Sequence, residues 1–518
     1  MITIEKIKLH NFRKFQNFVV DLNKDTNILI GDNETGKSTI LFALDLVLSG
    51  SKNKIETAGL EFLFNHKTIA EYFKTEKKYN ELPKLYIEIY INKQNTEDLN
   101  GDNNSEEKNA DGLKLLIEPD ENYRNEIIDI LKNEDTNFPF EFYQIEFKTF
   151  QGKVYSGYKK YVNYIFVDNS KTGNEYAMKE YINNMYNSYA DNAERFDHQN
   201  KYRKAKTDFN NEVLKEINKK VENNAFGVKN DNKSNMITDL TIFENDIPIE
   251  NKGKGRQCFI KTQFAIGKAK NTIDVVLIEE PENHLSHHNM QLLLNQIAEV
   301  KDRQLFIATH NNLISARLDL RKVIMLSNMK VDPIPFNTLK EDTAKYFMKA
   351  ADHNILEFIM AKNIILVEGD AEFMLISKMF EIVTHEKESK NNVSIISVNG
   401  ISFKRYLDLA KLLKIKTAVI RDNDKDYKKN CEDNYNDYVN DYIQIFADTD
   451  PDRYTFEVNM YLDNKDTCDK LFSENRKTLS PREYMLKNKT EAAYTLLISN
   501  EDLNVPEYIK KAIEWIKN

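Results

Sequence analysis

Apolar and polar residues alternate along the first 30 residues, and the pattern then changes. Residues 1–12 place isoleucine or leucine at every second or third position, and two further short apolar runs, FVVDL and TNILI, follow them. This alternation predicts strands. From Ser38 onward apolar residues recur at a helical spacing, and a glycine-containing loop separates this helix from the last strand. A strand, a glycine loop and a helix in this order are typical of a nucleotide-binding fold.

Two later segments, 85–91 and 140–150, alternate with a period of two residues. They predict strands of an antiparallel arm. The polar stretch from Asn95 to Gly112 lies between them, and we expect it to be a solvated loop.

Between about residues 174 and 224 the apolar residues take a helical period in a highly charged background. This predicts an inserted helical module. Its apolar stripe would form either a core or the seam of a dimer. The stripe consists of Met178, Ile182, Met185, Tyr189, Phe209, Val213, Ile217 and Val221.

Strands return at 273–278 and 304–309, with a helix predicted at 286–299 between them. This rhythm is typical of a parallel α/β sheet. A second α/β unit begins near residue 350. Its predicted strands are 363–368, 393–398 and 417–422, with helices after the first and the second. Because these apolar runs are short and continuous, we expect the strands to be buried centrally.

The composition is that of a large globular protein. The chain has 518 residues, of which 41% are hydrophobic and 30% are charged, and its net charge is −9. This net charge repels nucleic acid, so DNA binding would need local basic patches or metal ions. No apolar stretch approaches the roughly 18 residues of a membrane span, and charges occupy the place of a secretory apolar segment, so we expect a cytoplasmic protein without membrane partners. Cys258, Cys431 and Cys468 are too far apart for a disulfide framework or a zinc ribbon.

The loop from Gly31 to Ser38 satisfies G-x-x-x-x-G-K-[ST] in full, between a strand and a helix as that motif requires. Its backbone N–H groups and the helix N-terminus would wrap a phosphate, Lys37 would reach the β- and γ-phosphates, and Ser38 would ligate Mg²⁺. The residues expected to bind the nucleotide here are Gly31, Asn33, Gly36, Lys37, Ser38 and Thr39.

The strand at 273–278 ends in Glu279-Glu280-Pro281-Glu282. This places Glu279 at the Mg²⁺ position and Glu280 where it would orient or deprotonate the attacking water. The next strand ends in Thr309-His310, at the edge where open α/β sheets contact their ligands, so His310 would face the γ-phosphate.

Acidic residues also follow two strands of the second α/β unit. Glu368 ends the first strand and Glu372 lies four residues later, on the same face of the helix that begins there. Asp422 and Asp424 end the third strand and, by strand alternation, would share a face. Carboxylates that converge at one sheet edge need cations, and Mg²⁺ or Mn²⁺ suit oxygen ligands. Two such ions would support phosphodiester cleavage.

The segments LHNFRKF, GDNETGKST, GKGRQ, VVLIEEPENHL and FIATH resemble the ATP-binding-cassette-like ATPases of the RecF and SMC type. The resemblance implies that ATP lies between two heads, with Glu280 as the catalytic glutamate and His310 as the switch histidine. It implies that Gly255 and Gln257 belong to a degenerate signature segment that contacts the partner's γ-phosphate, although the usual serine is missing. Arg13 matches the N-terminal arginine of this group.

The motifs Val367-Glu368-Gly369, Val398-Asn399-Gly400 and Asp422-x-Asp424 are similar to a Toprim domain. An ATPase head followed by a Toprim domain resembles the OLD (overcoming lysogenization defect) family of ATPase-nucleases, which includes the nuclease subunit of Gabija anti-phage systems and effectors attached to retrons. By the same resemblance Glu457 matches a later metal-binding acid, and Lys489 matches a C-terminal lysine that would stabilise the scissile phosphate, with Lys487 as a competing candidate.

The resemblance implies an α/β fold of four parts. We expect an N-terminal ATPase part at 1–170, a helical dimerisation insert at 171–235, a C-terminal ATPase part at 236–348 and a Rossmann-like Toprim nuclease domain at 349–518.

The motifs predict an enzyme: an ATP-regulated, divalent-metal-dependent DNA endonuclease or nickase. The resemblance to the OLD family implies that it acts in anti-phage defence. Its partners would be DNA and further copies of the chain, and the resemblance implies in addition a helicase-like protein, or a reverse transcriptase with its small DNA or RNA. The alternative is a DNA-clamping or DNA-sensing ATPase of the RecF and SMC type, in which the Toprim part is a non-catalytic scaffold. The sequence leaves open whether ATP activates or inhibits cleavage.

Overall fold

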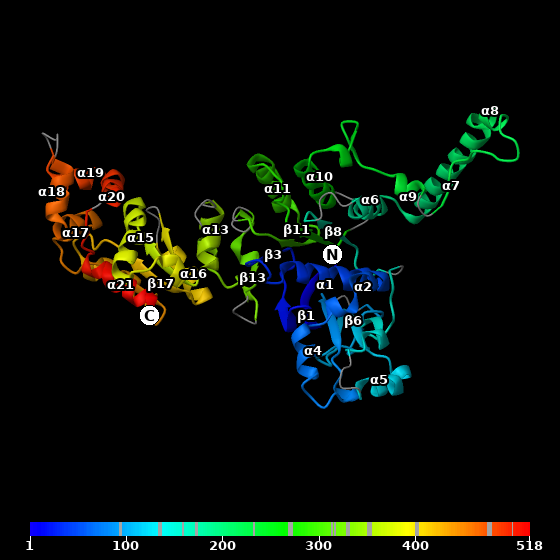
Figure 1. Cartoon of the computed structure of the whole chain (residues 1–518), viewed down its shortest axis with the longest axis horizontal. Helices are drawn as coiled ribbons and strands as arrows, with labels where there is room; N and C mark the ends of the chain where they lie inside the picture. The colour runs from blue at the N-terminus through cyan, green and yellow to red at the C-terminus, as the bar shows by residue number, and fades with distance from the viewer. Residues whose placement is uncertain are drawn as a thin grey trace. The chain divides into compact units, whose positions relative to one another are not determined.

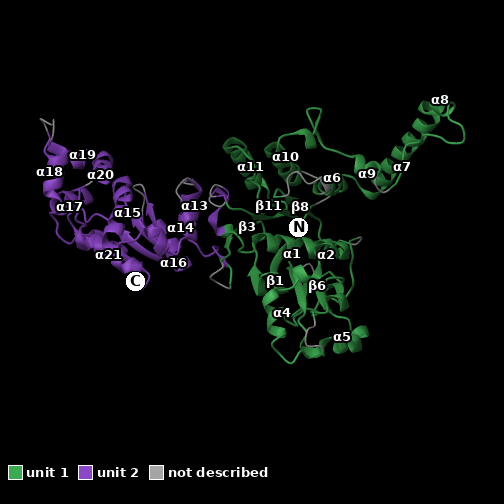
Figure 2. Cartoon of the chain, viewed as in Figure 1, with its two compact units in different colours: residues 1–310, 322–333 green, residues 311–321, 334–518 purple. Residues whose placement is uncertain are grey.

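The computed structural model describes the chain except for residues 93–95, 133–136, 158–159, 171–174, 232–233, 268–272, 312–313, 315–316, 328–331, 350–354, 399–402, 474–478 and 500. The chain divides into two compact units. Unit 1 comprises residues 1–310 and 322–333, and unit 2 comprises residues 311–321 and 334–518 (Figure 2). In the part of the chain that is described, no helix combines the length and the apolar character needed to cross a bilayer.

The described residues of unit 1 form two large sheets and one two-stranded hairpin (Figure 1). The first is antiparallel, as the alternating segments predict, and its strands are β1 (Ile4–Phe12), β2 (Phe15–Asp21), β4 (Leu85–Ile91), β5 (Asn100–Gly101), β6 (Ala110–Pro119) and β7 (Tyr143–Thr149). The second runs parallel in the order β13-β3-β12-β11-β8, and its strands are β3 (Thr26–Ile30), β8 (Tyr164–Asp168), β11 (Val275–Glu279), β12 (Gln304–Ala308) and β13 (Val323–Met325). The predicted parallel α/β rhythm is confirmed.

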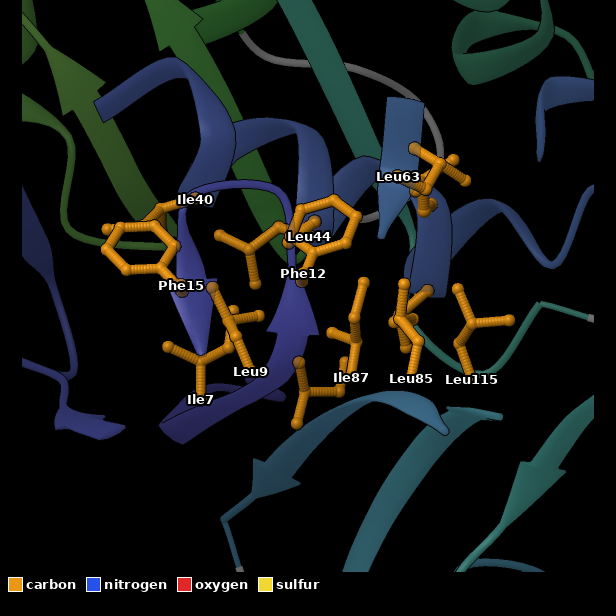
Figure 3. Packing of buried hydrophobic residues seen from close by; sticks show 14 of the residues in the cluster. Ile7, Leu9, Phe12, Phe15, Ile40, Leu44, Leu63, Leu85, Ile87 and Leu115 are labelled. Carbon is orange, nitrogen blue, oxygen red and sulfur yellow. The ribbon is translucent and has the colours of Figure 1, made fainter. Parts of the chain in front are cut away.

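Helix α1 (Lys37–Ser49) lies between these two sheets, and it begins one residue before the predicted start. Almost all of its residues are buried, because both faces pack against a sheet. Figure 3 shows the side that faces the antiparallel sheet, where side chains of α1, β1, β2, β4 and β6 point toward one another. Those labelled there include Ile7, Leu9, Phe12, Phe15, Ile40, Leu44, Leu85, Ile87 and Leu115.

The remaining helices of unit 1 cover the sheets or form the insert. They are α2 (Lys52–Ala58), α3 (Leu60–Leu63), α4 (His66–Tyr72), α5 (Arg124–Leu131), α6 (Glu175–Tyr189), α7 (Asn192–Asp208), α8 (Lys215–Asn218), α9 (Met236–Asp239), α10 (Lys254–Ile266) and α11 (His287–Glu299). A short hairpin, β9 (Phe243–Glu244) and β10 (Ile247–Pro248), precedes α10.

The helical period predicted for the insert is confirmed, but its apolar stripe has two different environments. Met178, Ile182 and Met185 on α6 are buried in unit 1. Phe209 and Val213, beyond α7, are 45% and 59% exposed, and Ile217 is 46% exposed. The first half of the stripe is therefore core, whereas a dimer seam formed by the second half stays a prediction.

The prediction of a solvated loop between residues 95 and 112 is wrong in part. The segment contains β5 and the start of β6, and Leu99, Asn104 and Asp111 are buried. The cause is Glu88, a fully buried carboxylate on β4 that accepts hydrogen bonds from the Ser105 N–H (2.8 Å) and hydroxyl (2.7 Å). Because a buried carboxylate needs such partners, it holds the polar segment against the sheet.

Unit 2 is built on a parallel sheet in the order β16-β15-β17-β18, with strands β15 (Asn363–Val367), β16 (Val393–Ser397), β17 (Lys416–Ile420) and β18 (Ile443–Phe446). A two-residue strand, β14 (Ile334–Pro335), precedes it in the chain. Its helices are α13 (Glu341–Lys349), α14 (Ile355–Met360), α15 (Asp370–Thr384), α16 (Phe403–Leu413), α17 (Phe456–Asp463), α18 (Lys465–Ser473), α19 (Pro481–Lys487), α20 (Lys489–Ile498) and α21 (Glu507–Lys517). Helix α15 packs against α20 and α21 over a common core (Figure 1).

The division into two units does not decide where the four predicted parts begin and end. Those boundaries, at 170/171, 235/236 and 348/349, stay predictions.

The core around α1 gives a stability prediction. Phe12→Ala removes a fully buried ring and should lower the free energy of unfolding of unit 1 by about 3–5 kcal/mol, through lost burial and a residual cavity. The control Phe62→Ala truncates a ring that is 61% exposed and should change it by less than about 0.5 kcal/mol. Urea unfolding followed by circular dichroism measures both, and equal effects of the two substitutions would contradict the assigned core.

Candidate functional site

The glycine loop between β3 and α1 has a shape that two of its glycines make possible. Gly31 has φ +153°, and a Cβ there would lie 2.4 Å from the carbonyl oxygen of Leu326. Gly36 has φ +106°, and a Cβ there would lie 2.4 Å from the ring of Phe15. The Thr35 hydroxyl donates a hydrogen bond of 2.8 Å to the Asp32 carbonyl across the loop. The backbone is therefore pre-set for the close approach of a phosphate.

Lys37 is folded back onto this loop. Its ammonium group donates hydrogen bonds to the carbonyls of Gly31 (2.7 Å) and Asp32 (2.9 Å). Burial lowers the pKa of Lys37 to about 8, against the opposing effect of nearby carboxylates, chiefly Asp32 and Glu280. The loop carbonyls hold this cation where the motif would place a phosphate.

A cavity of about 490 Å³ opens in front of the loop. It brings together most of the residues that the sequence assigns to the nucleotide. Its lining consists of Arg13, Lys14, Asn33, Glu34, Gly36, Lys37, Ser38, Thr39, Glu280 and His310.

Of the predicted acid pair and the histidine, Glu280 and His310 line this cavity, whereas Glu279 does not. Glu279 is the last residue of β11 and is 9% exposed, whereas Glu280 takes a left-handed conformation with φ +46°. His310 Nε2 lies 3.7 Å from Glu280 Oε1. Burial, and next the positive charge of Lys37, lower the pKa of His310, which favours the neutral imidazole. Burial also lowers the pKa of Arg13, and Glu279 opposes that shift.

The predicted signature segment forms the start of α10, with Gly253 as its N-cap. A Cβ on Gly255 would lie 2.1 Å from the carbonyl oxygen of His284, so only glycine fits against the turn that follows the acid pair. The side-chain amide of Gln257 donates to the carbonyls of Glu250 (3.2 Å) and Lys252 (2.8 Å). Within the chain Gln257 therefore holds its own loop, and its contact with a partner's phosphate stays a prediction.

Sequence reasoning assigned no role to two residues at this site. Lys14 lines the cavity and donates a 2.6 Å hydrogen bond to the Glu34 carbonyl, and Glu282 accepts hydrogen bonds from the loop that carries His310. Lys14 directly follows Arg13, and Glu282 lies within the acidic motif itself. These positions, beside Arg13 and within the acidic motif, are the features of the sequence that could have indicated both residues.

A second group of functional side chains gathers at the carboxyl edge of the unit 2 sheet. Glu368 follows β15, and Asp422 lies two residues beyond β17, the strand that pairs with β15. Glu372 lies in the first turn of α15, whose N-cap is Gly369. Because the carboxyl ends of neighbouring parallel strands meet at one edge, these acids lie close enough there for their charges to act on one another.

Glu457 and Lys489 join this group through one main-chain contact. The Phe456 N–H, in the first turn of α17, donates a 2.7 Å hydrogen bond to Asp422 Oδ1. This fixes Glu457, the next residue, beside the other acids, and it is only 3% exposed. Lys489, the first residue of α20, places its ammonium 3.0 Å from Glu457 Oε2. Lys489, rather than Lys487 at the end of α19, therefore faces the acids.

Burial and repulsion between carboxylates raise the pKa values of Asp422 and Glu372. Burial, and next the charges of Glu372, Glu368 and Glu457, raise the pKa of Asp422 to about 8. Burial also raises the pKa of Glu372 to about 7, with Glu457 and Glu368 acting in the same direction. Burial acts to lower the pKa of Lys489, but the carboxylates, first Glu457, outweigh it and raise that pKa.

The donor set fits a hard divalent cation. Glu368 Oε2 and Glu457 Oε1 are buried, and neither has a hydrogen-bond partner among the described residues. Carboxylate oxygens are the ligands that Mg²⁺ and Mn²⁺ take, and an ion there would offset the repulsion. In the described ranges no three acidic, histidine or cysteine side chains already have the spacing of a metal site, so the acids would have to draw together around an ion.

The expectation that Asp424 shares a strand face with Asp422 is wrong. Strand β17 ends at Ile420, and Asp424 has a left-handed φ of +50°. Its carboxylate is 57% exposed and accepts a 3.2 Å hydrogen bond from Arg421. The alternation argument fails because the strand stops before both acids, and a metal role for Asp424 stays a prediction. Asn399 and Gly400 of the second Toprim motif lie outside the described residues.

The raised pKa values of Asp422 and Glu372 predict how stability depends on pH. A carboxyl group whose pKa is higher in the folded state than in the unfolded state keeps its proton longer when folded, so its ionisation costs stability. In EDTA, the free energy of unfolding of unit 2 should fall as the pH rises from about 5 to about 8 and then level off. Urea unfolding followed by the fluorescence of Trp515, the single tryptophan, which packs on the unit 2 core, measures this.

Asp422→Asn should reduce the slope of the free energy of unfolding against pH, because Asn cannot ionise. Asn keeps an oxygen that accepts the hydrogen bond from the Phe456 N–H. Asp424→Asn removes an exposed carboxylate two residues away and should keep the wild-type slope. A flat wild-type profile, or an unchanged slope in Asp422→Asn, would contradict the assignment.

Comparison with known proteins gives two family models that match this chain. A family model described as an AAA ATPase domain matches residues 2–314, and one described as an overcoming lysogenization defect protein-like TOPRIM domain matches residues 359–424. The chain is 21% identical over 547 aligned positions to a protein named Endonuclease GajA from Bacillus cereus (strain HuB5-5), covering 82% of this chain and 78% of that protein.

Two solved structures are also similar. The SMC head domain from Thermotoga maritima shares 13% identity and covers 64% of this chain and 97% of its own, with a TM-score of 0.31. The C-terminal region of the Burkholderia pseudomallei OLD protein shares 22% identity and covers 30% of this chain and 97% of its own, with a TM-score of 0.26. The assignment rests on the two family models, of which the first covers more than half of the chain. The chain belongs to the AAA ATPase domain family and joins this ATPase to an OLD-like Toprim domain, which confirms the predicted α/β fold class.

Proposed function

We propose that this protein is an ATP-regulated, divalent-metal-dependent DNA endonuclease or nickase. One observation carries the proposal: Glu372, Asp422 and Glu457 are buried together at a sheet edge beside the ammonium of Lys489. A protein keeps repelling carboxylates in its interior at a cost in stability, and a catalytic metal site is a sufficient reason for that cost. The relative named Endonuclease GajA supports the same conclusion.

The residues at the sheet edge of unit 2 would have two roles, metal binding and stabilisation of the phosphate charge. Glu368, Glu372, Asp422 and Glu457 would hold Mg²⁺ or Mn²⁺. Two such ions, when bound, would supply charge stabilisation at the attacking and leaving oxygens of a phosphodiester. Lys489 is half exposed, so its ammonium can leave Glu457 and stabilise the charge that develops on the scissile phosphate.

The regulatory site would be the cavity in unit 1. Lys37 would exchange the loop carbonyls for the β- and γ-phosphates, and Ser38 and Glu279 would hold the accompanying Mg²⁺. Glu280 would orient the attacking water, and His310 would contact the γ-phosphate. The signature segment lacks its usual serine, which favours slow turnover and a regulatory use of ATP.

Further copies of the chain and DNA are the partners that we propose. The exposed apolar side chains of the insert, Phe209, Val213 and Ile217, support self-association. A role in anti-phage defence, with a helicase-like partner or a reverse transcriptase and its small nucleic acid, rests on the OLD-type arrangement of the two domains.

Cleavage of supercoiled plasmid tests the nuclease. With Mg²⁺ or Mn²⁺ the wild-type protein should give nicked or linear product, and Asp422→Ala should give none. Lys489→Ala should slow cleavage by roughly 100-fold, because it removes one stabilising charge. The control Asp441→Ala changes an exposed aspartate of the same unit and should cleave like the wild type. Full activity of Asp422→Ala would contradict the nuclease and favour the DNA-clamping ATPase with a non-catalytic Toprim part.

The response to ATP tests the regulation. ATP should change the cleavage rate of the wild-type protein, and Lys37→Ala should cleave at a rate that ATP no longer changes, since its main phosphate contact is lost. The direction of the wild-type change gives the sign of control. If Lys37→Ala responds to ATP like the wild type, the nucleotide acts elsewhere.

A further inference from the structure

Glu282 lies in the turn that follows the acid pair, Glu279 and Glu280. The proposed function assigns no role to it. One carboxylate oxygen, Oε1, accepts two hydrogen bonds, from the Thr309 hydroxyl (2.6 Å) and from the His310 main-chain N–H (2.9 Å). The other oxygen, Oε2, is buried and has no hydrogen-bond partner among the described residues. Both hydrogen bonds to Oε1 thus come from the segment that carries the histidine.

The same two segments are joined at a further point, and the turn after β11 has a hydrogen bond of its own. The Glu280 N–H donates to the Ala308 carbonyl (2.9 Å), and the Asn283 side-chain amide donates to Glu280 Oε2 (2.5 Å). The other oxygen, Glu280 Oε1, lies 3.7 Å from His310 Nε2. The turn after β11 therefore fixes Glu280 through Asn283 and fixes the His310 segment through Glu282.

Glu282 accepts a hydrogen bond from His310, which lines the nucleotide cavity. Glu280 and His310 line that cavity, whereas Glu282 does not. Both hydrogen bonds to its Oε1 come from the segment that carries His310, so its effect on hydrolysis would be exerted through that segment.

We propose that Glu282 is a positioning residue for ATP hydrolysis: through Thr309 and the main chain of His310 it holds the imidazole opposite Glu280. The inference rests on the ATP site of the proposed function and deepens it. A displacement of about 1 Å at a reacting centre can cost on the order of 100-fold in rate without a loss of binding. Glu282 should accordingly govern the rate of hydrolysis, and not the affinity for nucleotide.

Steady-state ATPase rates and equilibrium binding of a fluorescent ATP analogue, measured on the full chain, test this. Glu282→Ala should lower kcat by about 10-fold or more while KM and the affinity change by less than about 3-fold. Glu282→Gln should keep most of kcat, because its amide oxygen can accept both hydrogen bonds. The double variant Glu282→Ala/His310→Ala should be no slower than His310→Ala alone, since both act through one group. Glu299→Ala, at the exposed end of α11, is the matched control and should match the wild type.

Three results would overturn the proposal. They are an unchanged kcat in Glu282→Ala, a loss of nucleotide affinity as large as the loss of rate, and full additivity with His310→Ala. If the wild-type protein hydrolyses no ATP, both this proposal and the hydrolytic part of the proposed function fail. If the wild-type protein hydrolyses ATP and Glu282→Ala does so at the same rate, only this proposal is overturned.

Discussion

Carboxylates that repel one another in a protein interior are the constraint around which the C-terminal unit is organised. Glu372 lies on α15, Glu457 on α17 and Asp422 in the loop after β17, and each is nearly inaccessible to water. Only a fold that fixes the ends of those elements can keep them together. The Phe456 N–H ties α17 to Asp422, and Lys489 ties the start of α20 to Glu457. At the other end of α20, Lys378 on α15 donates to the carbonyls of Leu496, Leu497 and Ser499. These bonds set the helices around the acids.

The N-terminal unit holds hydrogen-bond donors in position for a phosphate. Lys37 and the loop glycines form a pre-set cradle, and the two sheets that enclose α1 make it rigid. Facing this cradle, Glu280 and His310 stand at the ends of neighbouring strands. Each unit thus places its chemistry at the carboxyl edge of a parallel sheet, where strands end and loops begin.

Strongly patterned parts of the sequence predicted the structure well. The phosphate loop, the parallel strands and the acids at their ends follow from short apolar runs bounded by a motif, because such runs have few alternatives in a buried sheet. Asp424 was misplaced because the pattern does not show that β17 ends at Ile420.

Other features depend on contacts between residues far apart in the chain. The polar segment after β4 is held down by Glu88, a residue that a pattern of alternation treats as solvated. The place of Glu457 depends on one hydrogen bond to Asp422, 34 residues earlier than Phe456. The role proposed for Glu282 depends on its hydrogen bonds to the segment after β12, which follows it in the chain. The periodicity of the sequence does not show any of these three contacts.

The central claim is that the buried acids of unit 2 exist to hold a divalent cation. Binding of Mn²⁺ without nucleotide, followed by electron paramagnetic resonance at about pH 8, where the pKa values allow ionisation, tests it most directly. The account predicts saturable binding to the wild-type protein and to Lys37→Ala, and binding at least about 10-fold weaker to Asp422→Asn. Equal binding of Mn²⁺ to the wild type and to Asp422→Asn would contradict it.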